Sequence, residues 1–165
     1  MQNKTNEIYI VGAGMVGLCL AHQLRSKYPK KKIVLLEKEQ DIGMHSSGRN
    51  SGVIHAGIYY EPDSIKAKVC IKGSKRLKRW INERELPINN CGKIIIPQSK
   101  EVDFEIDKLF LRGIENGAKV EIINNHKINS LSKHIFSSTG RAIWSPNTSV
   151  VNPKAILSKL EDELQ

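Results

Sequence analysis

Short apolar runs alternate along the chain with longer segments in which apolar residues recur every three or four positions. Residues 7–11 (EIYIV) and 32–37 (KIVLLE) are continuous apolar runs rich in β-branched residues, which is typical of buried strands. Residues 15–27 lie between them, carry apolar side chains at a spacing of four and contain no proline, so they predict a helix. A strand, a helix and a strand within about 30 residues predict a βαβ unit with a parallel strand pair.

The remaining pattern continues this alternation and ends in a helix. Residues 41–52 are rich in glycine and serine and predict a loop. We further expect a strand or a strand-to-loop segment over 53–60 and strands over 91–97, 119–123 and 141–146. The expected helices are 64–84, 101–116 and one from 153 onward. The pattern therefore predicts an α/β fold. No strand follows the last helix, so we expect its apolar face and the outer strands to stay exposed.

The charge balance is basic, with 26 Lys and Arg against 17 Asp and Glu and a formal net charge of +9. Such a protein can bind nucleic acid, a membrane surface or an anionic small molecule. Lysines and arginines recur along the helix predicted over 64–84 between apolar residues such as Ile65 and Trp80, which indicates an amphipathic helix with a solvated basic face. Aromatic residues make up only 5% of the chain and no nucleic-acid-binding motif is visible, so we predict no nucleic-acid partner.

Cysteine usage and hydropathy indicate the compartment. The three cysteines show no CxxC spacing, so neither a disulfide framework nor a metal site is predicted. No apolar run approaches the roughly 20 residues that span a bilayer, and the polar N-terminal segment does not resemble a signal peptide. We therefore predict a cytoplasmic protein without a transmembrane segment, and peripheral association with a membrane stays open.

A glycine-rich turn joins the first predicted strand to the first predicted helix. Gly12, Gly14 and Gly17 form a G-x-G-x-x-G motif, and the second strand ends 20 positions later in Glu37. In a dinucleotide-binding fold the first glycine permits the turn, the second admits a pyrophosphate, and the third lets the helix pack on the sheet. The acid accepts hydrogen bonds from the adenosine ribose, which argues against NADP but does not separate NAD from FAD.

A second unusual segment follows, HSSGRNSGVIHAGIYY at residues 45–60. It passes from a loop of small residues into an apolar run that contains His55. Small residues and backbone amides suit close approach to a pyrophosphate or a flat ring. A nicotinamide dehydrogenase usually continues at this point with further βαβ units, so this insertion is a distinguishing feature.

Several segments together resemble one flavoprotein family. They are GAGMVG, LLEKE, SSGRNSGVIHAGIYYEPDSIKAKVC, CGKIIIP and IWSPNTSVVNP. The chain resembles, over nearly its whole length, the N-terminal part of the FAD-dependent L-2-hydroxyglutarate oxidases and dehydrogenases of the D-amino-acid-oxidase-like superfamily. NSGVIHAGIYY and the Cys-Gly-Lys are the specific elements of this resemblance, whose members are more than twice as long.

The resemblance implies FAD as the cofactor and a 2-hydroxy acid as the substrate. The family oxidises such an acid to a 2-oxo acid by hydride transfer to flavin N5. The cofactor-binding residues implied are Gly12, Gly14 and Gly17 at the pyrophosphate, Glu37 at the adenosine ribose, and Ser46, Ser47, Asn50 and Ser51 on the flavin side.

His55 is our candidate for the base that takes the hydroxyl proton, since its ordinary pKa lies near neutrality. Three alternatives stay open: a hydrogen bond that orients the flavin, a covalent flavin link, and an ordinary buried histidine. Tyr59 and Tyr60 are candidates for binding a substrate carboxylate, with packing as the alternative.

Arg49 either meets a phosphate or is a surface charge. Cys70 and Cys91 are interpreted as packing residues, because no histidine or helix N-terminus in the sequence pattern activates them.

The predicted architecture is a Rossmann-like FAD-binding domain interleaved with the start of a substrate-binding α+β domain. We assign residues 1–86 to FAD binding and residues 87–165 to an incomplete substrate-side domain with a soft boundary. The chain is thus expected to be the N-terminal part of a larger enzyme.

Three hypotheses follow for the incomplete chain. It joins a separately encoded C-terminal half, it is an inactive truncated remnant, or it is a dinucleotide-binding module without redox activity. Whether the chain by itself is an active enzyme stays open.

Overall fold

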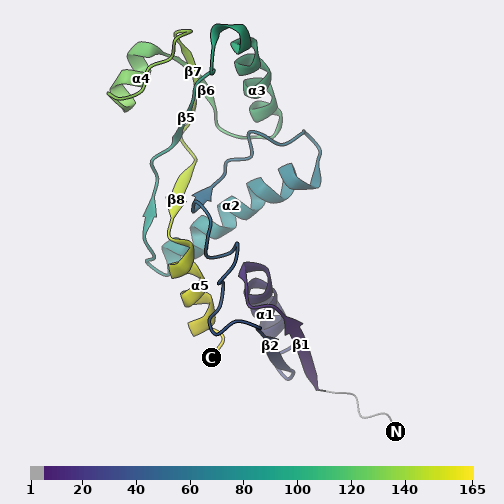
Figure 1. The fold of residues 1–165 in the computed structure, drawn as a ribbon. Helices are drawn as coiled ribbons and strands as arrows, with labels where there is room; N and C mark the ends of the chain where they lie inside the picture. The colour runs from purple at the N-terminus through teal and green to yellow at the C-terminus, as the bar shows by residue number, and fades with distance from the viewer. Residues whose placement is uncertain (1–5) are drawn as a thin grey trace. The chain divides into compact units, whose positions relative to one another are not determined.

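A computed structural model describes residues 6–165, which divide into two compact units (Figure 1). The first unit comprises the described residues up to Gly52 together with Asn152–Gln165, and the second comprises Val53–Val151. These boundaries differ from the predicted functional division at residue 86, which concerns the ligand that each segment binds and stays a prediction.

The first unit contains the predicted βαβ element. Strands β1 (Glu7–Val11) and β2 (Lys32–Leu36) run parallel, with Glu7 opposite Lys32 and Val11 opposite Leu36, and helix α1 (Met15–Lys27) connects them. The apolar runs therefore form the parallel strand pair that the sequence predicts.

The last helix, α5 (Pro153–Asp162), belongs to the same unit and packs against α1. Its three apolar residues Ile156, Leu157 and Leu160 are buried. The side chain of His22 on α1 hydrogen-bonds the carbonyl of Leu160 at 2.8 Å. The expectation that the last helix leaves its apolar face exposed is therefore wrong, because α1 supplies the covering surface.

The second unit holds two small antiparallel sheets. One has the order β3 (Val53–Ile54), β8 (Ser149–Val151), β4 (Ile88–Asn89), and the other has the order β5 (Lys93–Ile95), β7 (Arg141–Ser145), β6 (Glu121–Asn124). The helical elements are α2 (Ile65–Glu83), the 3₁₀ turn η1 (Lys100–Val102), α3 (Phe104–Glu115) and α4 (Asn125–Leu131).

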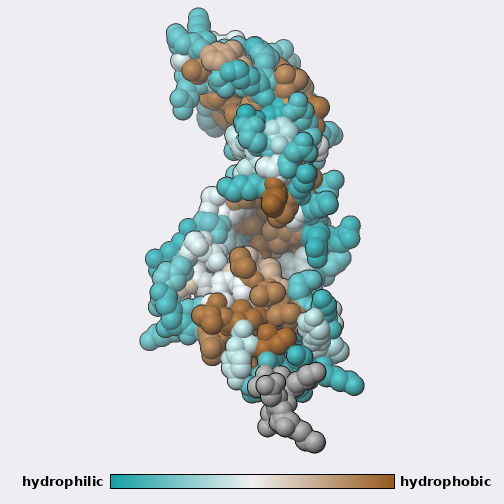
Figure 2. Space-filling view, turned by 90° about the vertical axis from the view of Figure 1, so that its right-hand side faces the viewer, coloured by the Kyte–Doolittle hydropathy of each residue, from teal (hydrophilic) through white to brown (hydrophobic). Residues whose placement is uncertain are grey.

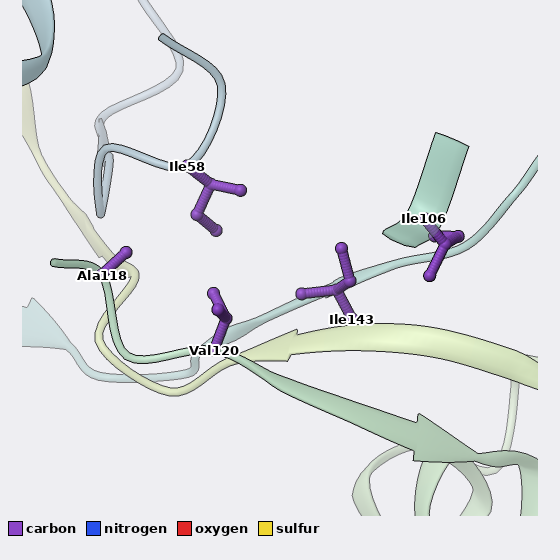
Figure 3. Packing of buried hydrophobic residues seen from close by; sticks show 5 residues of the cluster. All are labelled: Ile58, Ile106, Ala118, Val120 and Ile143. Carbon is purple, nitrogen blue, oxygen red and sulfur yellow. The ribbon is translucent and has the colours of Figure 1, made fainter. Parts of the chain in front are cut away.

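The core of the second unit lies between the second sheet, α3 and the segment after β3. Ile58, Ile106 and Ile143 point toward one another beside Ala118 and Val120 (Figure 3). Ile58 and Ile143 are 2% and 0% exposed. The apolar residues of the segment after β3 thus contribute to a core although they do not continue the strand.

The segment over 53–60 is a strand only at Val53–Ile54, so the strand-to-loop alternative is the one that the structure confirms. Gly57 adopts φ +88°, a conformation outside the strand region. The side-chain amide of Asn116 donates to the carbonyls of Gly57 and Tyr60 at 2.9 and 2.7 Å. These contacts satisfy backbone carbonyls that a neighbouring strand would otherwise pair.

Three short elements, β4, α4 and β8, are not predicted by the sequence pattern. The α4 helix begins where the side chain of Asn124 accepts a hydrogen bond from the amide of Lys127 at 3.0 Å.

Among the described residues, no helix is both long and apolar enough to cross a bilayer.

Candidate functional site

The glycine-rich turn brings α1 into direct contact with the end of β1. Gly12 adopts φ +97°, and its amide donates to the carbonyl of Leu36 at 2.7 Å. A Cβ atom on Gly17 would lie 1.9 Å from the carbonyl oxygen of Gly12. Only a residue without a side chain permits this approach, which is the packing role that the motif predicts for its third glycine.

Glu37 follows the end of β2 and is held by three backbone amides. Its carboxylate accepts from Ala13 at 2.7 Å, from Lys38 at 2.9 Å and from Glu39 at 3.1 Å. These hydrogen bonds, led by the one from Ala13, lower the pKa of the Glu37 carboxyl. Because a carboxylate offers about four accepting positions, this arrangement leaves roughly one position for a ribose hydroxyl.

The loop after β2, residues 41–52, which we call the serine-rich loop, is hydrogen-bonded to the glycine-rich turn. The hydroxyl of Ser47 accepts from the amide of Met15 at 3.0 Å, and the amide of Gly43 donates to the carbonyl of Ala13 at 3.2 Å. A Cβ atom on Gly14 would lie 2.9 Å from the Ser47 hydroxyl oxygen. The first turn of α1 and the loop therefore face each other at hydrogen-bonding distance.

Asn50 shapes this loop from within. Its side-chain amide donates to the carbonyls of Ser46 and Ser47 at 3.1 and 2.9 Å, and its side-chain oxygen accepts from the amide of Gly52 at 2.9 Å. The side chain of Asn50 thus already makes three hydrogen bonds within its own loop. It is therefore better suited to fixing the loop conformation than to contacting a ligand. Ser51, the next residue, is exposed.

A cavity of about 410 Å³ lies between the glycine turn, the end of β2 and the serine-rich loop. Of the predicted cofactor-binding residues, it is lined by Gly12, Gly14, Glu37, Ser46 and Ser47. Its volume falls within the range of small-molecule pockets. A second cavity of about 380 Å³ adjoins the other side of Glu37 and is lined in part by Ala13 and Glu39.

The cavities, the lack of a side chain at Gly14 and the fixed carboxylate fit a dinucleotide. Gly17 does not line the 410 Å³ cavity, and its role is to let α1 pack against Gly12. Asn50 and Ser51 do not line this cavity either. The backbone groups of Ala13 and Gly43 hold Glu37 and the serine-rich loop. The sequence did not indicate these two residues, because every residue type has a backbone amide and carbonyl.

His55 belongs to the second unit and its side chain is exposed, which excludes the alternative of an ordinary buried histidine. Partial desolvation, followed by the positive charge of Lys93, lowers the pKa of His55 below its ordinary value. The imidazole is therefore biased toward its neutral form, which is the form that accepts a proton.

Lys93 is a functional candidate that sequence reasoning missed. Its ammonium lies 4.6 Å from the centroid of the Tyr59 ring and acts electrostatically on His55. The Cys-Gly-Lys segment was noted only as a mark of resemblance, since no sequence pattern relates Lys93 to a histidine 38 positions earlier.

The remaining residues named from the sequence are two tyrosines, one arginine and two cysteines. Tyr59 is 39% exposed and Tyr60 is partly buried. Arg49 lines a cavity of about 370 Å³ between the serine-rich loop and α5. Cys70 is partly buried, and its thiol donates to the carbonyl of His55 at 3.5 Å, whereas Cys91 is exposed, so the interpretation of Cys91 as a packing residue is wrong.

The family model for FAD-dependent oxidoreductases matches residues 7–165. The chain belongs to the FAD-dependent oxidoreductase family. This match confirms the predicted family, the α/β fold and FAD as the cofactor.

Relatives of this chain within the FAD-dependent oxidoreductases include L-2-hydroxyglutarate dehydrogenases. The mitochondrial enzyme of Dictyostelium discoideum is 42% identical over 159 residues, which are 96% of this chain and 36% of the relative. The corresponding proteins of Indibacter alkaliphilus and Homo sapiens are 35% and 34% identical, and this chain covers 40% and 34% of them. The chain thus spans between about a third and two fifths of these relatives, and the mitochondrial names do not support the predicted cytoplasmic location.

Solved FAD-dependent oxidoreductases share the fold. The L-α-glycerophosphate oxidase of Mycoplasma pneumoniae, solved with FAD bound, has a TM-score of 0.83 and 25% identity over 96% of this chain and 42% of its own. The glycine oxidase of Geobacillus kaustophilus has a TM-score of 0.81 at 16% identity, covering 94% of this chain and 42% of its own, which shows the fold alone.

The close approach of Gly17 to Gly12 generates a prediction about stability. Gly17→Ala places a methyl group against a backbone carbonyl, so we expect it to destabilise the first unit by at least about 2 kcal/mol. Hydrogen exchange of the α1 amides measures this loss. Both tryptophans, Trp80 and Trp144, lie in the second unit, and their fluorescence reports whether that unit stays folded.

Gly73→Ala is the matched control for this substitution. Gly73 lies inside α2, and a Cβ atom there meets nothing within 4 Å, so alanine is expected to stabilise its helix by up to about 1 kcal/mol. Unchanged exchange of the α1 amides in Gly17→Ala would contradict the packing role of this glycine.

Proposed function

We propose that this chain supplies the FAD-binding unit and the candidate base of an oxidoreductase that converts a 2-hydroxy acid, of the L-2-hydroxyglutarate type, to a 2-oxo acid. The observation that carries the proposal is 42% identity over 96% of the chain to an L-2-hydroxyglutarate dehydrogenase. The cavity between the glycine turn, Glu37 and the serine-rich loop supports the cofactor half of the proposal.

The first unit has the groups that an FAD needs at its adenosine diphosphate end. Gly12 and Gly14 leave room for a pyrophosphate beside the first turn of α1, whose free amides and positive dipole end favour an anion. Glu37 is ionised and fixed beside them, ready to accept from a ribose hydroxyl. Ser46 and Ser47 are assigned to the flavin side, and Asn50 and Ser51 shape or extend that loop.

When bound, FAD supplies the hydride acceptor at flavin N5. As the hydroxy acid gave up its α-hydrogen as a hydride to that acceptor, the neutral imidazole of His55 would take the hydroxyl proton, and the C–O bond would become a carbonyl. Desolvation and, after it, the charge of Lys93 lower the pKa of His55 and so favour the neutral base. The ammonium of Lys93, which lies over the Tyr59 ring, would be the cation for a substrate carboxylate. Orientation of the flavin and a covalent link to it stay as the alternative roles of His55.

The relatives are about two and a half times as long as this chain, as the 36% and 40% coverage implies. We infer that catalysis needs the polypeptide that corresponds to their unmatched part. Without it, the chain is expected to behave as an inactive remnant or as a dinucleotide-binding module.

The relation between Lys93 and His55 generates a prediction about pKa. Removing a positive charge that disfavours the imidazolium raises the pKa of the histidine, so Lys93→Met is expected to raise the pKa of His55. An NMR titration of the His55 ring protons, assigned with His55→Gln, measures it.

Lys127→Met on α4 is the matched control, because no interaction of Lys127 contributes to the pKa of His55. If the pKa of His55 were unchanged or lowered in Lys93→Met, the proposed electrostatic effect of Lys93 on His55 would be wrong.

The proposed reaction is tested by anaerobic reduction of bound flavin. The chain is mixed with FAD and with the C-terminal part of the Dictyostelium discoideum relative that it does not match, and L-2-hydroxyglutarate is added. We expect loss of the visible flavin absorbance and formation of 2-oxoglutarate, with the rate lowered about 100-fold or more in His55→Gln.

The D-enantiomer serves as the control substrate and is expected to leave the flavin oxidised. Bound flavin that L-2-hydroxyglutarate does not reduce would overturn the proposed substrate, whereas failure to bind flavin would overturn the cofactor site. Flavin that remains on the chain after denaturation would favour the covalent role of His55.

A further inference from the structure

The segment that carries the candidate base lies outside regular secondary structure. Residues 55–60, which we call the histidine loop, follow β3 and precede α2. Gly57 in this loop adopts φ +88°, and a Cβ atom there would lie 2.8 Å from the side chain of Ile71 on α2. Because the histidine loop is not paired with a strand, its conformation depends on contacts that its backbone makes with side chains of other elements.

Side chains from α2 and α3 hold the histidine loop by its backbone carbonyls. The side-chain amide of Asn116, the residue directly after α3, donates to the carbonyls of Gly57 and Tyr60 at 2.9 and 2.7 Å. The thiol of Cys70 on α2 donates to the carbonyl of His55 at 3.5 Å. Burial raises the pKa of this thiol, so it stays a donor near neutral pH. The loop is therefore held on both sides of its turn.

Asn116 is itself fixed by the end of its helix. Its backbone amide donates to the carbonyl of Arg112 at 3.0 Å, and the following Gly117 adopts φ +73°, which is typical of a glycine-terminated helix end. Arg112 adds a longer contact to the carbonyl of Tyr59 at 3.5 Å and forms an ion pair with Glu61 at 2.7 Å. The end of α3 is thus a rigid support from which side chains reach the loop.

The histidine loop directs two residues of the proposed site outward. His55 and Tyr59 are exposed, whereas Ile58 is 2% exposed and belongs to the core. The ammonium of Lys93 lies 4.6 Å from the centroid of the Tyr59 ring, and its charge acts on His55. This division between outward and inward side chains depends on the turn whose carbonyls Asn116 holds.

We propose that Asn116 is a positioning residue for the proposed reaction. By holding two carbonyls of the histidine loop, it keeps His55 in the orientation in which the imidazole takes the hydroxyl proton. Both N–H groups of the Asn116 side chain are used within the protein, so this residue acts through the loop and not on the substrate. The inference rests on the proposed function, since it takes His55 as the base.

Replacing Asn116 by alanine is expected to loosen the histidine loop without unfolding the second unit. The core beneath the loop, which includes Ile58 and Ile143, keeps its contacts. Hydrophilic residues predominate in the upper part of Figure 2, on the side of the second unit that carries α3. Because the loop also exposes His55 and Tyr59, water can bond to the carbonyls that Asn116 releases.

The first test measures His55 in the full chain without FAD or substrate, so its failure is distinguishable from failure of the proposed function. In Asn116→Ala the imidazole is expected to become more solvated and to move away from Lys93, and both changes raise the pKa of His55. We expect the midpoint of an NMR titration of the His55 ring protons to rise by at least about 0.3 pH. A general loss of stability does not move this midpoint in the folded chain.

The second test measures the reaction. The chain is combined with FAD and the C-terminal part of the Dictyostelium discoideum relative, as in the flavin-reduction experiment. Asn116→Ala is expected to bind flavin as the unmodified chain does and to lower the rate at saturating L-2-hydroxyglutarate about tenfold, because the base is misplaced and not removed.

Asn125→Ala is the matched control. The side-chain amide of Asn125 donates to the carbonyl of Ser137 at 3.0 Å, and its side-chain oxygen accepts from the amide of Ser137 at 3.0 Å. This asparagine also fastens a loop of the second unit, but its loss is expected to leave the pKa of His55 and the rate unchanged. Tryptophan fluorescence verifies that the second unit of each variant stays folded.

Asn116→Gln carries both tests if Asn116→Ala does not fold. Glutamine keeps the amide donors but displaces them by one methylene group, so it is expected to raise the titration midpoint of His55 and to lower the rate in the same direction.

Three results would overturn the proposal. The first is a folded variant at Asn116 in which His55 titrates as it does in the unmodified chain. The second is an equal rise of the midpoint in Asn125→Ala, which would make the effect one of general loosening. The third is a raised midpoint with an unchanged rate at saturating substrate, which would show that the loop conformation does not affect the reaction.

Discussion

The contact between α1 and the carbonyl of Gly12 is the constraint on which the cofactor site depends. With no side chain at Gly17, the helix begins directly against the end of β1, and a Cβ atom would come within 1.9 Å of that carbonyl oxygen. This approach sets the first turn of α1 beside Ser47 and Glu37 beside the amide of Ala13. The anion-favouring helix end, the fixed carboxylate and the cavity follow from one packing requirement.

The parts of this site that sequence could predict are those set by local pattern. The βαβ unit, the glycine roles and Glu37 follow from apolar runs and from spacing within 31 residues. The hydrogen bond between Ser47 and Met15 joins residues 32 positions apart. Lys93, on β5, affects His55, which follows β3 of the other sheet. No periodicity encodes such contacts, so the structure was needed to find them.

Two segments depart from their local pattern, and the physical causes are of the same kind. The segment after Ile54 is apolar enough for a strand, but Gly57 turns it and Asn116, from the end of α3, takes its carbonyls. The last helix carries an apolar stripe that the sequence leaves without a partner, and α1 covers it across more than 130 positions of chain. In both cases a distant segment decides the outcome, and tertiary contacts override the local pattern.

The central claim is that the first unit holds FAD between the glycine turn, Glu37 and the serine-rich loop. Hydrogen–deuterium exchange of the chain with and without saturating FAD tests it most directly. We expect slower exchange over residues 12–17 and 37–47, with little change in α3 and α4 of the second unit. Unchanged exchange over both of these segments, or protection confined to the second unit, would contradict it.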